Sequence, residues 1–431
     1  MKKLKIGDGS ESIVKKSAIF FVFSIINKSI PFALLPFLTA YIEPKGYGII
    51  AVMALVSSLC MPLVGLCSNM VLFQRFFKLN AFGRSNFIND AYKIIFINAI
   101  IILFLSFFLA DFVEIFLKIP IIWFQVAVLC AATGMVSNLT GEFFLLQSKP
   151  VHYGLFMTAS ALMNSGLALL FVVYFKYGWE GRGISLLISG FCLALIAITC
   201  MHKFGQLSRP GLNITTQGHT IIRLGSRLIP SAVGGWLLVM IDRVILTSVS
   251  SLELVGIYAV GIMLAQIVDI LLNSLSRMAQ PILAQYGLSE NMMDRVMLVR
   301  GIYIFFAISM LSVVVLSILS PIILDLMVDK RYHGALGVVF WVSLGFAFAN
   351  LGGIFLNLIL VTEKNIVTGY ISAATFCFSV VCAYFLINYN GIIGAAWANA
   401  LSGLFNLTLF LVVCQIYNPL PWLDKRILIA N

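Results

Sequence analysis

Charged residues are scarce in this chain. Asp, Glu, Lys and Arg make up 10% of its 431 residues, whereas 61% are hydrophobic. Because a soluble globular protein carries about 25% charged residues, this composition excludes that class and indicates a polytopic membrane protein. The formal net charge of +11 does not indicate a nucleic-acid partner, since the basic residues lie at the ends of apolar runs and form no single patch.

Motifs for metals and cofactors are also missing. The four histidines show no ligand spacing, and the eight cysteines lie in apolar runs without a CxxC pair, so we expect neither a metal site nor a disulfide framework. No glycine-rich loop with a following lysine is present, as an ATP site would require. We expect no cofactor, and coupling to a proton or a sodium ion stays open.

Long apolar runs dominate the chain. A membrane-spanning helix needs about 20 such residues, and twelve runs meet this length, near 17–41, 47–72, 91–110, 121–147, 153–175, 183–201, 224–249, 254–281, 297–319, 334–361, 366–387 and 391–417. The termini and the segments after even-numbered runs hold 20 of the 28 Lys and Arg residues. Because connections rich in Lys and Arg stay on the cytoplasmic side of the membrane, we expect both termini in the cytoplasm.

The two halves of the chain repeat weakly. Gly48-Ile-Ile-Ala-Val52 matches Gly256-Ile-Tyr-Ala-Val260, and further weak matches follow in the same order. A six-helix repeat restarts on the same side of the membrane, so the copies should be parallel. We therefore predict an all-α membrane protein with two pseudo-symmetric six-helix bundles around a central cavity, formed by a lobe over 1–205, a cytoplasmic linker over 206–222 and a lobe over 223–431.

Several motifs resemble those of a known family. They are Asp242-Arg243-Val-Ile-Leu246 followed by Ser251-Leu-Glu-Leu-Val-Gly-Ile-Tyr258, with Pro44-Lys-Gly-Tyr-Gly48 and Gly391-Ile-Ile-Gly-Ala-Ala396 in support. The chain resembles the polysaccharide or O-antigen (Wzx-type) flippases of the multidrug/oligosaccharidyl-lipid/polysaccharide exporter superfamily. The segment after Pro321 departs from the usual pattern, because it reads Asp325-Leu-Met-Val-Asp329.

The resemblance implies transfer of undecaprenyl-pyrophosphate-linked oligosaccharide from the inner to the outer leaflet of the bacterial cytoplasmic (inner) membrane, by alternating access and without enzymatic activity. Membrane lipid and the lipid-linked glycan would be its partners, together with a polysaccharide polymerase and a chain-length regulator. One alternative is an ion-coupled drug or organic-cation antiporter of the same superfamily. A membrane-embedded polymerase is disfavoured, because the chain has no long loop to carry catalytic groups.

Basic residues inside or at the ends of the runs are candidates for binding the pyrophosphate or an acidic sugar. Lys28 lies about 16 Å along the first run, at 1.5 Å per residue, and Arg243 lies inside the seventh. A charge at this depth marks a functional site by default, although Lys28 could instead be satisfied by neighbouring carbonyls or a carboxylate. Arg75 and Arg277 end two runs on the cytoplasmic side, where ordinary positive-inside anchoring is the simpler interpretation.

Three acids lie in the runs. Asp242, Asp269 and Glu142 could each bind a coupling proton or sodium ion. Structural hydrogen bonding between helices is the more common reason for such an acid, and for Asp242 a brace is at least as good an explanation. The sequence leaves these alternatives open.

Overall fold

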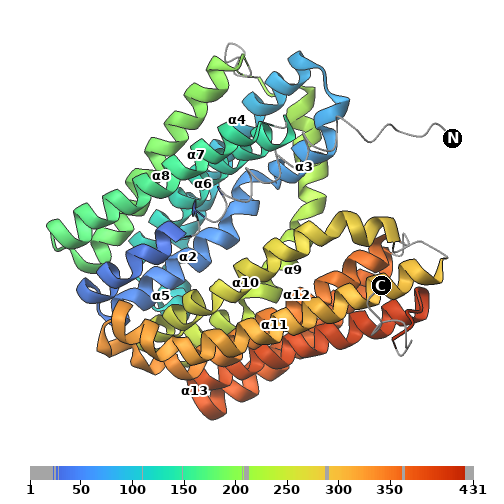
Figure 1. Cartoon of the computed structure of the whole chain (residues 1–431). Helices are drawn as coiled ribbons and strands as arrows, with labels where there is room; N and C mark the ends of the chain where they lie inside the picture. Colours follow the sequence, from blue (N-terminus) through green and yellow to red (C-terminus); the bar gives the residue numbers. More distant parts are fainter. Residues whose placement is uncertain are drawn as a thin grey trace. The chain divides into compact units, whose positions relative to one another are not determined.

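The computed structural model describes residues 23, 26–27, 29–108, 110–147, 149–205, 207, 213–286, 291–361 and 365–422. Within these residues every regular element is helical, which confirms the predicted all-α fold. Internal contacts divide the chain into two units, Met1–Trp236 and Leu237–Asn431, and each unit is described by itself (Figure 1). The boundary between the units lies inside the helix α9.

The first unit consists of helices joined by short connections. After a short apolar helix, Ser29–Tyr41, the elements are α2 (Pro44–Gly65), α3 (Ser68–Arg75), η1 (Phe76–Lys78), α4 (Ala81–Phe108), α5 (Ala110–Leu117), α6 (Ile121–Leu146), α7 (Pro150–Ala168), η2 (Leu169–Tyr174), α8 (Gly178–Lys203) and the first part of α9 (Thr216–Val249). Pro44 and Pro150 begin their helices, where a missing N–H costs nothing.

The second unit holds the rest of α9, α10 (Leu252–Tyr286), α11 (Met292–Met327), η3 (Lys330–Ala335), α12 (Leu336–Val361) and α13 (Asn365–Tyr417). Asn291 caps α11, because its side chain accepts a hydrogen bond from the backbone nitrogen of Met293 at 3.1 Å. α13 contains two helical stretches, since the backbone leaves the helical region at Asn390 and Gly391. Gly391 has a φ of 55°, which glycine adopts without steric cost.

Each of the twelve expected apolar runs contains a described helix. Nine helices of the described part are long and apolar enough to cross a membrane, and α9, as the bent pair Thr216–Leu237 and Val239–Val249, adds a tenth. Helices suit hydrocarbon because they satisfy their own backbone polar groups. The exact number of crossings stays a prediction.

The second expected run, 47–72, is not one continuous helix. It is divided into α2 and α3 at Leu66 and Cys67, whose φ angles of 45° and 50° lie in the left-handed region. Pro62 inside α2 has no N–H with which to continue the helical hydrogen-bond pattern, and its carbonyl accepts from the backbone nitrogen of Cys67 at 3.0 Å. The run therefore ends one helix and starts another.

One helix lies at the centre of each unit. α6 packs against α2, α4, α7 and α8, and α12 packs against α10, α11 and α13; α12 and α13 lie side by side in the orange to red part of Figure 1. α6 is the fourth expected run of the first half and α12 is the fourth of the second. This correspondence agrees with the predicted six-helix repeat.

The segment before α9 belongs to the first unit by its contacts. The sequence predicts a linker over 206–222, but the described residues of this range start α9 at Thr216, and Ile221 is fully buried. Trp236 remains attached to the same unit, because its indole Nε1 donates to Ser58 Oγ of α2 at 2.8 Å. The boundary between the two units therefore lies after the expected linker. Hydrogen bonds to Ser58 of α2 and to Asp90 of α4 hold the first part of α9 to the first unit.

Candidate functional site

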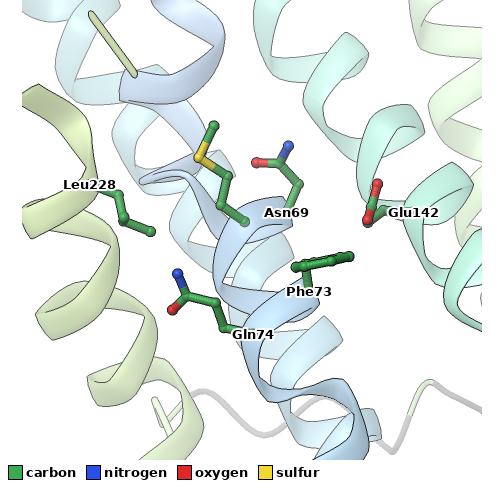
Figure 2. A pocket seen from close by; sticks show the side chains of 6 residues that line it. Asn69, Phe73, Gln74, Glu142 and Leu228 are labelled. Atoms are coloured by element: carbon green, nitrogen blue, oxygen red, sulfur yellow. The ribbon is translucent and has the colours of Figure 1, made fainter. Parts of the chain in front are cut away.

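A cavity of about 370 Å³ lies within the first unit, between α3, α6 and α9. Its polar lining consists of Asn69 and Gln74 of α3 and Glu142 of α6, and its apolar lining of Met70, Phe73 and Leu228. In Figure 2, Phe73 points from α3 toward the carboxylate of Glu142, while Gln74 and Leu228 lie on the side of α9. The cavity thus combines an aromatic face, two amides and one carboxylate.

The break between α2 and α3 positions the α3 side of this cavity. Gly225 of α9 lies against the break so closely that a Cβ atom there would approach the carbonyl oxygen of Leu66 to 2.0 Å. Asn98 of α4 donates to the carbonyl of Val64 at 3.1 Å, which satisfies a backbone group at the end of α2. Irregular backbone in a membrane protein is tolerated where it is enclosed by protein, and the contacts with Gly225 and Asn98 enclose this break.

The helical period of α3 separates a cavity face from a packed face. Asn69, Met70, Phe73 and Gln74 follow one another at helical spacing and line the cavity. On the other face Ser68, Val71 and Leu72 are fully buried. Arg75 lies one turn after Val71 on that packed face, and it is absent from the cavity lining.

The polar groups of the cavity are available to a ligand. Among the described residues, no hydrogen bond or ion pair engages the side chains of Asn69, Gln74 or Glu142. Glu142 is half-buried at the end of α6. A carboxylate accepts and an amide both accepts and donates, so this set can bind hydroxyl groups or a cation.

The cavity lies at the end of the unit where basic residues gather. Arg84 lies 4.4 Å from the ring centre of Phe76, and Lys149 lies 4.4 Å from that of Phe204. Arg223 and Arg227 of α9 are exposed. Under the predicted topology this end faces the cytoplasm.

An acid that the sequence analysis did not single out organises this same end. Asp90 of α4 is fully buried, and its Oδ2 accepts from the backbone nitrogens of Thr215 and Gly218, each at 2.9 Å, and from Thr215 Oγ1 at 2.5 Å. Lys93 donates to Asp90 Oδ1 at 3.3 Å and to the Asn213 carbonyl at 2.9 Å. Asp90 thereby caps the first turn of α9 from another helix. In the sequence, Asp90 is marked only by a lysine three residues later, at the start of an apolar run. This pattern is a weak indication of a buried acid.

In the second unit, Asp242 occupies a closed hydrogen-bonded position. Its Oδ2 accepts from the hydroxyl of Tyr258 at 2.5 Å and its Oδ1 from the backbone nitrogen of Arg243 at 2.8 Å. Tyr258 is fully buried and Asp242 is 4% exposed. These contacts link α9 to α10 within the unit, as expected of a brace, and whether Asp242 also binds a coupling ion stays untested.

Arg243 is less well satisfied than Asp242. Its Nη1 lies 2.9 Å from Met240 Sδ, a weak acceptor, and its Nε is buried without a hydrogen-bond partner in the described structure. Asp242 does not form an ion pair with the guanidinium group. Because Nε is sealed inside the unit, it faces no open site in the described structure, and the anion contact of Arg243 stays a prediction.

Asp269 joins α10 to α12. Its Oδ1 accepts from the side-chain amides of Asn273 at 3.1 Å and Asn350 at 2.9 Å, and Asn350 also donates to the carbonyl of Phe346 at 2.9 Å. The cluster links α10 to α12 through Oδ1, and no hydrogen bond among the described residues engages Oδ2 of Asp269.

The predicted site residues are divided between the two units. Lys28 lies outside the described residues, and the side chain of Arg277 is not described. Glu142 and Arg75 belong to the first unit, and Arg243, Asp242 and Asp269 to the second. Of these, Glu142 alone lines the cavity, and the binding roles of all seven stay predictions.

Comparison with known proteins identifies the fold. No protein-family model and no curated protein sequence matches the chain. Among solved structures, the lipid II flippase MurJ in an inward closed conformation is 12% identical with a TM-score of 0.73, covering 93% of this chain and 87% of its own. An inward-facing multidrug resistance MATE family transporter of the MOP superfamily is 10% identical with a TM-score of 0.70, covering 93% and 98%.

A MATE transporter from Vibrio cholerae is also similar, at 14% identity and a TM-score of 0.57, covering 95% of this chain and 98% of its own. Identities this low show the fold alone. That fold, a two-lobe helical membrane transporter fold, agrees with the superfamily that the sequence motifs resemble.

Proposed function

We propose that the protein is a flippase that moves undecaprenyl-pyrophosphate-linked oligosaccharide from the inner to the outer leaflet of the bacterial cytoplasmic membrane. The observation that carries this proposal is the cavity of the first unit, in which Asn69, Gln74 and Glu142 have no partner among the described residues and face the same space as Phe73. Its fold likeness to a lipid II flippase over 93% of the chain supports it.

Sugar chemistry suits this lining. Each sugar hydroxyl can donate to the Glu142 carboxylate and exchange hydrogen bonds with the two amides, and the ring of Phe73 offers an apolar face of similar size. A polyhydroxylated ligand can form hydrogen bonds with all three of these polar side chains at once. A purely apolar ligand would leave those groups unpaired.

The charged and lipid parts of the substrate need different surroundings. The basic residues around this end of the unit attract a pyrophosphate headgroup electrostatically, with Arg75, Arg277, Lys28 and Arg243 as proposed contacts along its path. The polyprenyl tail can remain in hydrocarbon against the lipid-facing side chains of the helices. Movement of the sugars through bare hydrocarbon is forbidding without such a path.

The organic-cation antiporter is the second candidate, and one specific observation favours it. Glu142 is the sole charged residue among the six that line the cavity, and a carboxylate beside an aromatic ring suits a cationic ligand. The fold likeness to multidrug resistance MATE transporters is compatible with this function. For either function, Glu142 or Asp269 would serve as the site of a coupling proton or sodium ion.

Complementation separates the two functions. The gene is deleted in its bacterial host, and the strain is complemented with wild-type protein or with Arg243→Ala, while surface glycan and resistance to organic cations are both measured. Restored glycan with the wild type and lost glycan with normal expression of Arg243→Ala support the flippase and the proposed contact. Restored cation resistance with unchanged glycan in the deletion strain would support the antiporter instead.

A further inference from the structure

The first unit contains an arginine without a carboxylate partner. Arg182 lies four residues after the start of α8 at Gly178. Its Nη1 donates to Asn164 Oδ1 of α7 at 2.8 Å and to Ser185 Oγ at 3.3 Å. None of the ion pairs among the described residues includes it. Its positive charge is therefore solvated by neutral groups alone.

Two helices hold this guanidinium. Asn164 comes from α7 and Ser185 from α8. Ser185 and Ser189 are 0% and 1% exposed. Arg182 is therefore directed into the helix bundle of the first unit.

Two glycines fix the backbone around Arg182. A Cβ atom on Gly181 would lie 2.8 Å from the carbonyl oxygen of Phe171, and one on Gly183 would lie 2.2 Å from the ring of Trp123. α8 is thus packed directly against its neighbours on both sides of the arginine. This close packing fixes the position of the Arg182 backbone. The guanidinium group cannot move away without shifting the packed helices.

Donor groups remain on the guanidinium. An arginine has five N–H donors, and the protein hydrogen bonds of Arg182 engage Nη1 only. Arg182 is partly exposed. Arg243 Nε is both buried and without a hydrogen-bond partner, but among the described residues no nitrogen of Arg182 is. Nε and Nη2 are therefore accessible to a small ligand.

We propose that Arg182, oriented by Asn164 and Ser185, binds an oxyanion, either a carboxylate or a phosphate. A guanidinium group binds such oxygens in bidentate fashion through Nε and Nη2. An unpaired charge inside a membrane protein is costly, and an anion would offset that cost. The anion is either a free ion or an acidic group of the transported glycan, and only the second source depends on the proposed function.

Asn164 makes the site testable without removing the arginine. It accepts from Arg182 and donates through Nδ2 to Ser189 Oγ at 3.1 Å, so its orientation is defined by both neighbours. Asn164→Asp has the same shape and brings a carboxylate to 2.8 Å from Nη1. The variant supplies the missing counter-charge from within the protein and should make an external anion unnecessary.

The experiment measures thermal unfolding of the purified full-length protein in detergent, in inorganic phosphate, in glucuronate, or in sodium chloride of equal ionic strength. Phosphate or glucuronate should raise the Tm of the wild type by a few degrees in a saturable way. Asn164→Asp should show a Tm at least as high as the wild type in chloride and no further rise. Arg300→Gln, at an exposed position of α11, is the control and should respond like the wild type.

Two results would overturn the proposal. One is a wild-type Tm that is the same in all three solutions, and the other is an unchanged anion response in Asn164→Asp. A response to phosphate alone assigns the site to a free phosphate, and a stronger response to glucuronate assigns it to a sugar carboxylate. These outcomes do not depend on transport, so a failure of the flippase proposal in cells would leave them interpretable.

Discussion

The carboxylate of Asp90 in α4 accepts a hydrogen bond from the backbone nitrogen of Gly218 in α9 at 2.9 Å, although 128 residues separate the two. With the two hydrogen bonds from Thr215, this contact satisfies donors at the start of α9 that the helix itself cannot satisfy. The same end of the unit holds the cavity. The position of Leu228, three turns further along α9, therefore depends on an acid in another helix.

Asp90→Ala should destabilise the first unit by about 1 to 3 kcal/mol, because it leaves a helix start uncapped and several donors without an acceptor. Thermal unfolding of the purified protein measures this effect as a lower Tm. Asp111→Ala is the matched control, since Asp111 is exposed in the first turn of α5, and it should leave the Tm unchanged. Equal Tm values for both variants would show that Asp90 does not stabilise α9.

Tyr258→Phe should destabilise the second unit by about 1 to 3 kcal/mol, because a buried carboxylate loses a strong hydrogen-bond donor without a change of shape. Asp242→Asn in the Tyr258→Phe background should cost little more, since the two groups act through the same 2.5 Å contact. Unfolding of both single variants and the double variant completes the cycle. Tyr370→Phe, at a 72% exposed position, is the control. Additive effects of the two changes would contradict the brace.

Glu142→Gln should distinguish the ligands of the cavity, because it removes a charge and keeps the shape. A neutral glycan keeps most of its hydrogen bonds to the glutamine, so surface glycan should fall only modestly, whereas an organic cation loses its counter-charge and its export should fall at least tenfold. Both activities are measured in the complemented deletion strain, with Glu180→Gln, exposed in α8, as the control. Complete loss of glycan would instead assign Glu142 to proton or sodium coupling.

Gly403→Ala should destabilise the packing of α12 on α13. A Cβ atom at Gly403 would lie 2.7 Å from the carbonyl oxygen of Gly345, and small residues allow such close approach of helices in membranes. We expect a loss of about 1 to 3 kcal/mol from overpacking, measured as a lower Tm. Gly353→Ala has open space around the new methyl group and should be neutral or slightly stabilising. A neutral Gly403→Ala would mean that the two helices separate readily.

Asp329 gives the connection before η3 a pH dependence. The Arg331 side chain and backbone nitrogen both donate to Asp329 Oδ1, at 2.9 and 3.0 Å, and the side-chain hydrogen bond is the largest cause of the lowered pKa of Asp329. A carboxyl group whose pKa is lower in the folded state stabilises above its unfolded pKa and loses this effect as the pH falls through the folded value.

The Tm of Asp329→Asn should therefore lie slightly below that of the wild type at pH 7, and the difference should shrink as the pH falls below about 4. The effect is small because the pair is exposed to solvent. Asp294→Asn, in the first turn of α11, is the comparison for a carboxylate near a helix start. A difference between wild type and Asp329→Asn that grows on acidification would contradict this assignment.

Local sequence patterns predicted the helices well and their interruptions poorly. The twelve apolar runs each contain a helix, because the length and hydropathy of a span are local properties. The division of 47–72 at Leu66 and Cys67 was missed, since neither residue is a usual left-handed residue and its conformation depends on packing against Gly225 of α9. Pro62 was the one local signal that could have indicated the break.

The candidate site was predicted only in part for the same reason. Glu142 was found because an acid in an apolar run is conspicuous, and it lines the cavity. Asn69 and Gln74 attracted no attention, since amides near a helix end are common. The sequence analysis did not single out Arg182, because its direction into the bundle depends on Asn164 of α7.

By itself, the sequence determined that this protein crosses the membrane as two related sets of helices, since hydrocarbon selects long apolar helices whatever their neighbours are. Tertiary structure alone decided which polar side chains remain without a partner. Asp242 is engaged by Tyr258 and Asp90 by the start of α9, whereas the Glu142 side chain and the Nε and Nη2 of Arg182 have no hydrogen-bond partner among the described residues. Whether a buried charge is satisfied depends on distances between helices, and local sequence does not specify those distances.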